Sequence, residues 1–158
     1  MDMDMDMNSD DNEILLRVLS EVFEGFAFMF VEEEPDFESE AVDECLRTKI
    51  DFSGKSVEGF LEIIASVDFC TDLAENILGI ESDELPQDAG ESALKEVVNV
   101  SCGYLLAEKF GTEEVFDLSI PQIEIFPENQ CKGLFTAKSH MIFLVDETPI
   151  LVRFVYGE

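Results

Sequence analysis

The amino-acid sequence predicts an α+β domain, with a largely antiparallel sheet covered by long helices. An amphipathic helical pattern occupies about residues 12–31, two alternating segments follow at 46–65, and β-branched and aromatic residues dominate from 115 onward. Helices and strands in this order, without βαβ repeats, are typical of the α+β class. The chain has 158 residues, enough for one domain with its own core, which we place at 12–158.

The first helical segment carries apolar residues at i, i+3 and i+4 spacing. They are Ile14, Leu15, Val18, Leu19, Val22, Phe23 and Phe26. Asp11 or Asn12 is suited to cap this helix, and we expect it to end near Val31. The acidic repeat before it, residues 1–11, has no packing periodicity and is expected to be a disordered tail. The acidic connection at 32–44 is expected to be solvated.

The next elements predict a hairpin and a second helix. Leu46, Thr48, Ile50 and Phe52 alternate with polar residues, as in a half-buried strand. A turn at 53–56 leads to a return strand at 57–65, so that one face of the hairpin meets helices and the other meets solvent. The second helix is predicted near 69–78, where Gly79 stops it.

Residues 91–110 predict a long helix that ends at Gly111. At about 100° per residue, four of its small and polar side chains fall within roughly 60° of one another. This stripe consists of Ser92, Glu96, Asn99 and Gly103. The residues expected to face a core are Ala93, Leu94, Val97, Val98, Tyr104 and Leu105.

After this helix, strands are expected near 115–126, 133–145 and 149–156, with a hairpin turn at 146–149. We find no internal duplication in the sequence. The first helix is comparable to the helix at 91–110, but its Glu21 is followed three residues later by Glu24 and not by Asn.

Charge limits the classes of partner. Thirty-seven acidic residues against nine basic ones give a formal charge of −28, which repels nucleic-acid backbones and anionic membranes. We therefore predict no nucleic acid and no membrane. Such a field favours a basic protein surface, although solubility alone is the simpler explanation. The sequence shows no signal peptide or transmembrane segment, and we expect a cytoplasmic protein.

The four cysteines, at positions 45, 70, 102 and 131, are expected to be reduced and mostly buried.

Asn99 lies between Val98 and Val100 in an otherwise apolar stretch of predicted helix. Asn in a helix interior costs about 0.7 kcal/mol relative to Ala, and nothing local calls for it, which makes Asn99 a functional candidate. Other candidate functional sites have less support in the sequence. His140 is the only histidine and is expected at the surface or a strand edge. No phosphate loop, calcium loop or zinc site is readable.

The pattern Ser92-x-x-x-Glu96-x-x-Asn99, with Gly103 after it, resembles the phosphatase motif of the CheC/CheX/FliY family of bacterial chemotaxis proteins. The predicted order of elements over about residues 12–156 agrees with this family. Because only one copy of the motif is present, the chain is most similar to the single-motif members, of which CheX is the type.

The resemblance implies a CheC-like fold and hydrolysis of the aspartyl phosphate on a CheY-like response regulator. It implies that Asn99 positions the attacking water, that Glu96 anchors the regulator's active-site lysine, and that Ser92 and Gly103 contact the partner. No cofactor of its own is expected, since the receiver domain holds the Mg²⁺. The resemblance also implies a homodimer.

Two alternatives remain open at this point. The first is a non-catalytic acidic adaptor that binds a receiver domain or another basic protein surface without turning it over. The second is a homodimer that buries the stripe itself, which would make Asn99 inaccessible.

Overall fold

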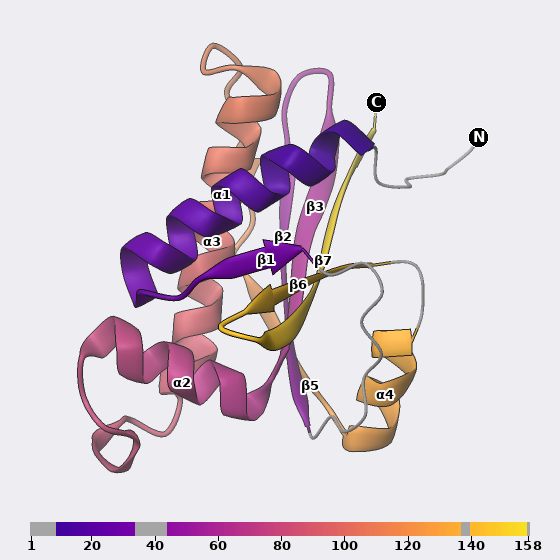
Figure 1. Cartoon of the computed structure of the whole chain (residues 1–158). Coiled ribbons are helices and arrows are strands. Elements are labelled where there is room, and N and C mark those ends of the chain that lie inside the picture. The colour runs from indigo at the N-terminus through magenta and orange to yellow at the C-terminus, as the bar shows by residue number, and fades with distance from the viewer. Residues whose placement is uncertain (1–8, 34–43, 137–139, 158) are drawn as a thin grey trace.

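The computed structural model describes residues 9–33, 44–136 and 140–157. Over these residues, three helices cover one face of a seven-stranded antiparallel sheet and a short helix lies on the other face (Figure 1). The helices are α1 (Ser9–Ala27), α2 (Val67–Leu78), α3 (Ala89–Phe110) and α4 (Glu128–Thr136), with a 3-10 turn, η1 (Ser82–Glu84). The strands are β1 (Val31–Glu33), β2 (Cys45–Ser53), β3 (Glu58–Ser66), β4 (Asp117–Leu118), β5 (Gln122–Phe126), β6 (Met141–Val145) and β7 (Thr148–Gly157). The predicted α+β class is confirmed.

The same arrangement of a helix, a strand and a β-hairpin occurs twice in the fold. Its order is β1-β6-β7-β3-β2-β4, and β5 also pairs with β2. One unit comprises α1, β1 and the β2–β3 hairpin, and the other comprises α3, β5 and the β6–β7 hairpin. The first strand of each unit pairs with the hairpin of the other, and β3 meets β7 at the centre. The topology thus contains a duplication that the sequence does not reveal.

The main core lies between the sheet and helices α1, α2 and α3. The inward side chains of β2 are Leu46, Thr48, Ile50 and Phe52, all buried as their alternation predicts. From α1, the core receives Leu15, Val18, Leu19, Val22 and Phe23. Each fully buried side chain of this size contributes about 1.5–3 kcal/mol relative to an exposed one. These contacts hold α3 as a rigid support for its outward face.

The expectation that the other face of the sheet meets solvent holds only in part, since Asp51 and Glu58 are exposed there, whereas α4 covers another part of the face. Cys45, Ile64 and Leu151 on the sheet form a second buried cluster with Cys131 of α4. The sequence predicted a strand over 133–145, but residues up to Thr136 are helical and β6 begins only at Met141. The helix forms because it buries Cys131 against the sheet, a tertiary contact that outweighs local β propensity.

The first helix begins earlier and ends earlier than predicted. It starts at Ser9, so the last three residues of the predicted tail are helical, and Asp11 is not a cap. Asp11 is buried, 3.1 Å from Lys109 Nζ and 3.0 Å from the Tyr156 hydroxyl. The predicted tail before Ser9 and most of the acidic connection at 32–44 lie outside the described residues.

The helix ends at Ala27 and not near Val31, because Phe28 adopts φ 58° and the chain then enters β1. The predicted hairpin turn at 146–149 is shorter than expected. Asp146 and Glu147 form it with φ of 48° and 70°, which suits a two-residue connection between twisted strands. Within the described residues, no helix has the length and apolar character needed to span a bilayer.

Candidate functional site

Helix α3 presents the predicted stripe to solvent. Ser92, Glu96, Asn99 and Gly103 are all exposed. Five of the six residues expected on the opposite side are buried, namely Ala93, Leu94, Val97, Val98 and Leu105. Tyr104 is the exception, with 47% of its surface exposed. It lies in the C-terminal half of α3, whereas the α2 residues at the hollow meet the N-terminal half. Periodicity alone therefore located the exposed stripe correctly.

The two central side chains of the stripe are available for an external partner. Within the described part of the chain, neither the Glu96 carboxylate nor the Asn99 carboxamide has a hydrogen bond or ion pair. The residues lie one turn apart on the same face of α3, where Cβ atoms are about 5–6 Å from one another. A carboxylate and a carboxamide are thus held side by side on a well-packed helix.

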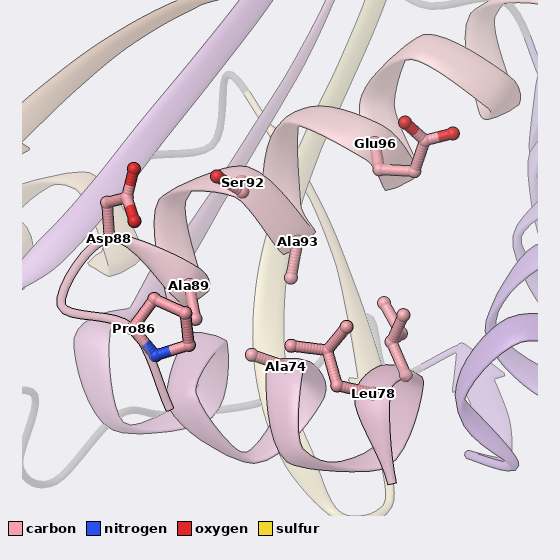
Figure 2. A pocket seen from close by; sticks show the side chains of 9 residues that line it. Ala74, Leu78, Pro86, Asp88, Ala89, Ser92, Ala93 and Glu96 are labelled. Atoms are coloured by element: carbon pink, nitrogen blue, oxygen red, sulfur yellow. The ribbon is translucent and has the colours of Figure 1, made fainter. Parts of the chain in front are cut away.

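A hollow of about 210 Å³ lies between α2 and α3, beside the N-terminal half of the stripe. Ala74, Ala89 and Ala93 line it, and their small side chains leave space that larger residues would fill. In Figure 2, Ser92 and Glu96 lie along α3 and Asp88 lies just before it, while Leu78 of α2 lies below Glu96. Leu78 is 52% exposed. The hollow therefore joins an apolar wall to two carboxylates.

Gly103 ends the stripe beside a second hollow, formed with Gly111, Phe116 and Leu118. A Cβ placed on Gly103 would have nothing within 4 Å. Packing within the chain therefore does not require glycine at this position, whereas a closely approaching partner would.

The cysteines are not suited to nucleophilic chemistry. All four are buried, reduced thiols, as predicted. Burial raises the pKa of Cys70 and of Cys102 to about 12, whereas nucleophilic thiols have a lowered pKa. A phosphoenzyme route through either of these two thiols is therefore disfavoured.

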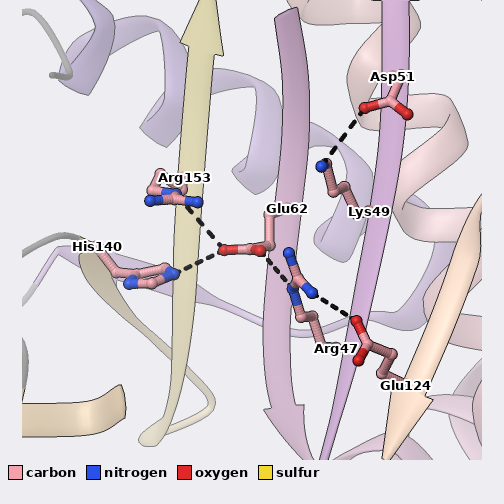
Figure 3. A network of polar contacts seen from close by, with 7 residues as sticks. All are labelled: Arg47, Lys49, Asp51, Glu62, Glu124, His140 and Arg153. Carbon is pink, nitrogen blue, oxygen red and sulfur yellow. Dashed lines mark hydrogen bonds and ion pairs between the residues drawn. The ribbon is translucent and has the colours of Figure 1, made fainter. Parts of the chain in front are cut away.

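The most concentrated polar cluster lies away from the stripe, on the face of the sheet that α4 partly covers. Glu62 of β3 is 2% exposed there and accepts hydrogen bonds from Arg47 at 2.5 Å and from His140 at 2.7 Å (Figure 3). Arg153 lies 3.6 Å from the same carboxylate, and Glu124 binds the other side of Arg47. Burial alone would raise the pKa of Glu62, but the bonds from His140 and Arg47 prevail and lower it to about 2.

This cluster corrects part of the expectation for His140. Its side chain is 5% exposed and is engaged with Glu62, so a surface position was wrong, whereas the strand-edge alternative holds, because His140 directly precedes Met141 and Ile142 of β6, which pair with β7 and not with β1. The alternation of Glu58 and Glu62 in β3 indicated a solvent-facing side, and sequence reasoning had no signal for the distant residues that enclose Glu62. The hollow beside Glu96 was missed for the same reason, since Leu78 and Pro86 reach it only through the packing of α2.

Comparisons with known proteins address the fold and the family. The model of the family "Chemotaxis phosphatase CheX" matches residues 47–125, half of the chain, including the whole stripe. No curated protein matches the chain in sequence.

Solved structures agree in fold over nearly the whole chain. The chemotaxis protein CheX of Vibrio vulnificus is 15% identical, with a TM-score of 0.68 over 90% of this chain and 93% of that one. CheX of Borrelia burgdorferi, in a complex with CheY, BeF3 and Mg²⁺, is 19% identical, with a TM-score of 0.60 over 93% and 97%. FliY of Thermotoga maritima is 12% identical, with a TM-score of 0.56 over 92% and 90%. At these identities, the structures bear on the fold alone.

Proposed function

This chain belongs to the family of the chemotaxis phosphatase CheX, and on that premise we propose that it hydrolyses the aspartyl phosphate of a CheY-like receiver domain. The observation that carries the proposal is the joint exposure of Glu96 and Asn99 on one face of helix α3, whose opposite face is buried. The CheX–CheY complex from Borrelia burgdorferi supports the choice of partner, since it pairs a protein of this fold with a receiver domain.

We assign to Asn99 the role of positioning the attacking water. Its Oδ1 accepts a hydrogen bond from the water, and its Nδ2 donates to the charge that develops on the phosphoryl oxygens. The water oxygen bonds to phosphorus as the bond from phosphorus to the receiver's carboxylate oxygen breaks. Inorganic phosphate leaves, and the receiver's aspartate becomes a free carboxylate. Mg²⁺ belongs to the receiver, and alignment of the water is the main contribution of this chain.

We assign to Glu96 the role of anchoring the receiver domain. An exposed carboxylate without an ion pair among the described residues is free to take the active-site lysine of the partner. That contact sets the position of Asn99, one turn away, against the phosphoryl group. The apolar wall of the neighbouring hollow, with Leu78, provides further contact area, and Gly103 admits a partner backbone.

The direct test is to mix the protein with a purified CheY-type receiver, phosphorylated by a small-molecule phosphodonor, and to time the loss of its phosphoryl group. We expect the phosphoryl group of the receiver to have a shorter lifetime when this protein is present at substoichiometric concentration. Binding of the receiver with an unchanged phosphate lifetime would favour the non-catalytic adaptor.

Replacing Glu96 with alanine is expected to raise KM for the phosphorylated receiver about tenfold, because a charge-assisted contact of this kind is worth roughly 1.5 kcal/mol. The turnover number should fall less than KM rises. Glu96→Lys should weaken binding further, through repulsion of the receiver's lysine. Steady-state kinetics with increasing receiver concentration separates the two parameters.

Glu21→Ala is the matched control for Glu96. Glu21 is an exposed glutamate on α1, the helix that corresponds to α3 in the other unit of the fold. Its replacement should leave both kinetic parameters near their original values. Equal losses in the two variants would show that general negative charge, and not a specific anchor at Glu96, recruits the receiver.

A further inference from the structure

The segment from the end of α1 to the start of β1, residues 26–31, alternates strictly between exposed and buried side chains. The buried residues are Ala27, Met29 and Val31, and the exposed residues are Phe26, Phe28 and Phe30. Their exposed fractions are 37%, 82% and 61%, respectively. Every outward position of this segment is thus a phenylalanine, where polar residues are usual. We call Phe26, Phe28 and Phe30 the aromatic corner. Large apolar side chains that are exposed together on one short segment are candidates for an interaction site.

The backbone at the aromatic corner favours glycine over the residue that is present. Phe28 follows the last turn of α1 with φ 58°, and its N–H donates to the Glu24 carbonyl at 3.2 Å while Met29 N–H donates to the Phe23 carbonyl at 3.1 Å. This is the helix-ending motif in which glycine is the common residue. The left-handed conformation costs a side chain about 1–2 kcal/mol. Since the ring is mostly exposed, packing within the chain does not compensate for that cost.

The aromatic corner is held at both ends. The Asn76 side-chain amide donates to the Ala27 carbonyl at 2.8 Å. Phe30 N–H donates to the Asp146 carboxylate at 2.8 Å, and Asp146 N–H donates back to the Phe30 carbonyl at 2.8 Å. These bonds tie the segment to α2 and to the β6–β7 turn. The rings are therefore presented by an ordered backbone, which lowers the entropic cost of binding.

Charge specifies the partner. The sequence contains no Lys or Arg from residue 18 to 46 or from 141 to 152. Exposed carboxylates flank the aromatic corner instead. They include Glu24 one turn before Phe28, Glu32 after Phe30, and Glu147 in the β6–β7 turn that is hydrogen-bonded to Phe30. Phenyl rings attract Lys and Arg cations over their faces, a contact this chain already makes where Lys49 lies 4.5 Å from the centre of the Phe60 ring.

We propose that the aromatic corner is a second interaction surface, which binds a basic amphipathic segment of another protein. Cations of that segment lie over the phenyl rings and between the carboxylates, and its apolar side chains contact the rings. None of its three residues lines the hollow beside the stripe on α3, so the surface is distinct from the stripe in the residues that form it.

Phe28→Gly tests the proposal with one substitution. The probe is a fluorescently labelled synthetic helical peptide of Arg and Leu, titrated with the full chain at physiological salt and followed by anisotropy. The variant should bind it about tenfold more weakly, while its melting temperature rises by a few degrees because the strained conformation is relieved. Phe30→Ser should weaken binding similarly. Ile120→Ser, which removes an 83% exposed apolar residue elsewhere, should not.

Four results would overturn the proposal. Unchanged peptide affinity in both Phe variants would show that charge alone captures the probe. A lower melting temperature in Phe28→Gly would assign the ring to the fold. A loss of self-association by sedimentation in the Phe variants would assign the corner to a second copy of this chain. The rate of receiver dephosphorylation should be unaffected, and a slower rate in Phe28→Gly would assign the corner to the receiver instead.

Discussion

Asn99→Ala is expected to lower the accelerated dephosphorylation of the receiver by about 100-fold or more, the usual effect of losing a group that aligns or stabilises a transition state. The side chain is exposed and has no bond to the described residues, so the fold should not suffer. Alanine is also the better helix former, by about 0.7 kcal/mol. Activity and stability should therefore change in opposite directions, which rates with a phosphorylated receiver and urea unfolding would measure.

Asn129→Ala is the control for Asn99→Ala. Asn129 is an exposed asparagine on α4, on the other face of the sheet, and its loss should leave the rate unchanged. Binding to a receiver locked by a phosphoryl analogue should survive in Asn99→Ala. An unchanged rate in Asn99→Ala would remove the proposed mechanism, and a loss of binding as large as the loss of rate would make Asn99 a docking residue.

Glu62→Gln is expected to destabilise the protein by about 3 kcal/mol near neutral pH. The pKa of Glu62 falls from 4.5 to about 2 in the folded chain, and a shift of that size corresponds to about 3 kcal/mol. Removing one partner of a buried ion pair has an effect of similar size. Glu124→Gln is the control, because Glu124 binds the same Arg47 but its side chain is 56% exposed. Its loss should change stability by less than about 1 kcal/mol.

The pH dependence of the Glu62 effect has a defined sign. Because the folded pKa is depressed, the stabilisation is present above about pH 4.5 and is lost as pH falls toward about 2. The difference in free energy of unfolding between the original protein and Glu62→Gln should therefore have its full value at pH 6. It should shrink toward zero as pH falls from about 4.5 to about 2. Urea unfolding of dilute protein at a series of pH values measures it. A difference independent of pH would mean that packing, and not the charge of Glu62, is the source.

Helical periodicity explains why the exposed face of α3 could be predicted. The stripe on α3 was readable because a 22-residue helix repeats its apolar spacing often enough to define two faces, and Asn99 interrupts an apolar stretch. The end of α1 was not readable. Residues 26–31 are all apolar, so a change from helical spacing to alternation within them leaves no mark in the hydrophobic pattern.

Local sequence patterns determined the fold class, the β2–β3 hairpin and the exposed face of α3, because each depends on a periodicity within one segment. Only the tertiary structure decided which residues close over the second face of the sheet and which line the hollow beside Glu96. Alternation in a strand shows that it has two faces, but not what covers them. His140 reaches Glu62 across 78 positions of sequence, and Leu78 reaches the stripe only through helix packing. Contacts between distant segments depend on the relative placement of whole elements, which no local pattern encodes.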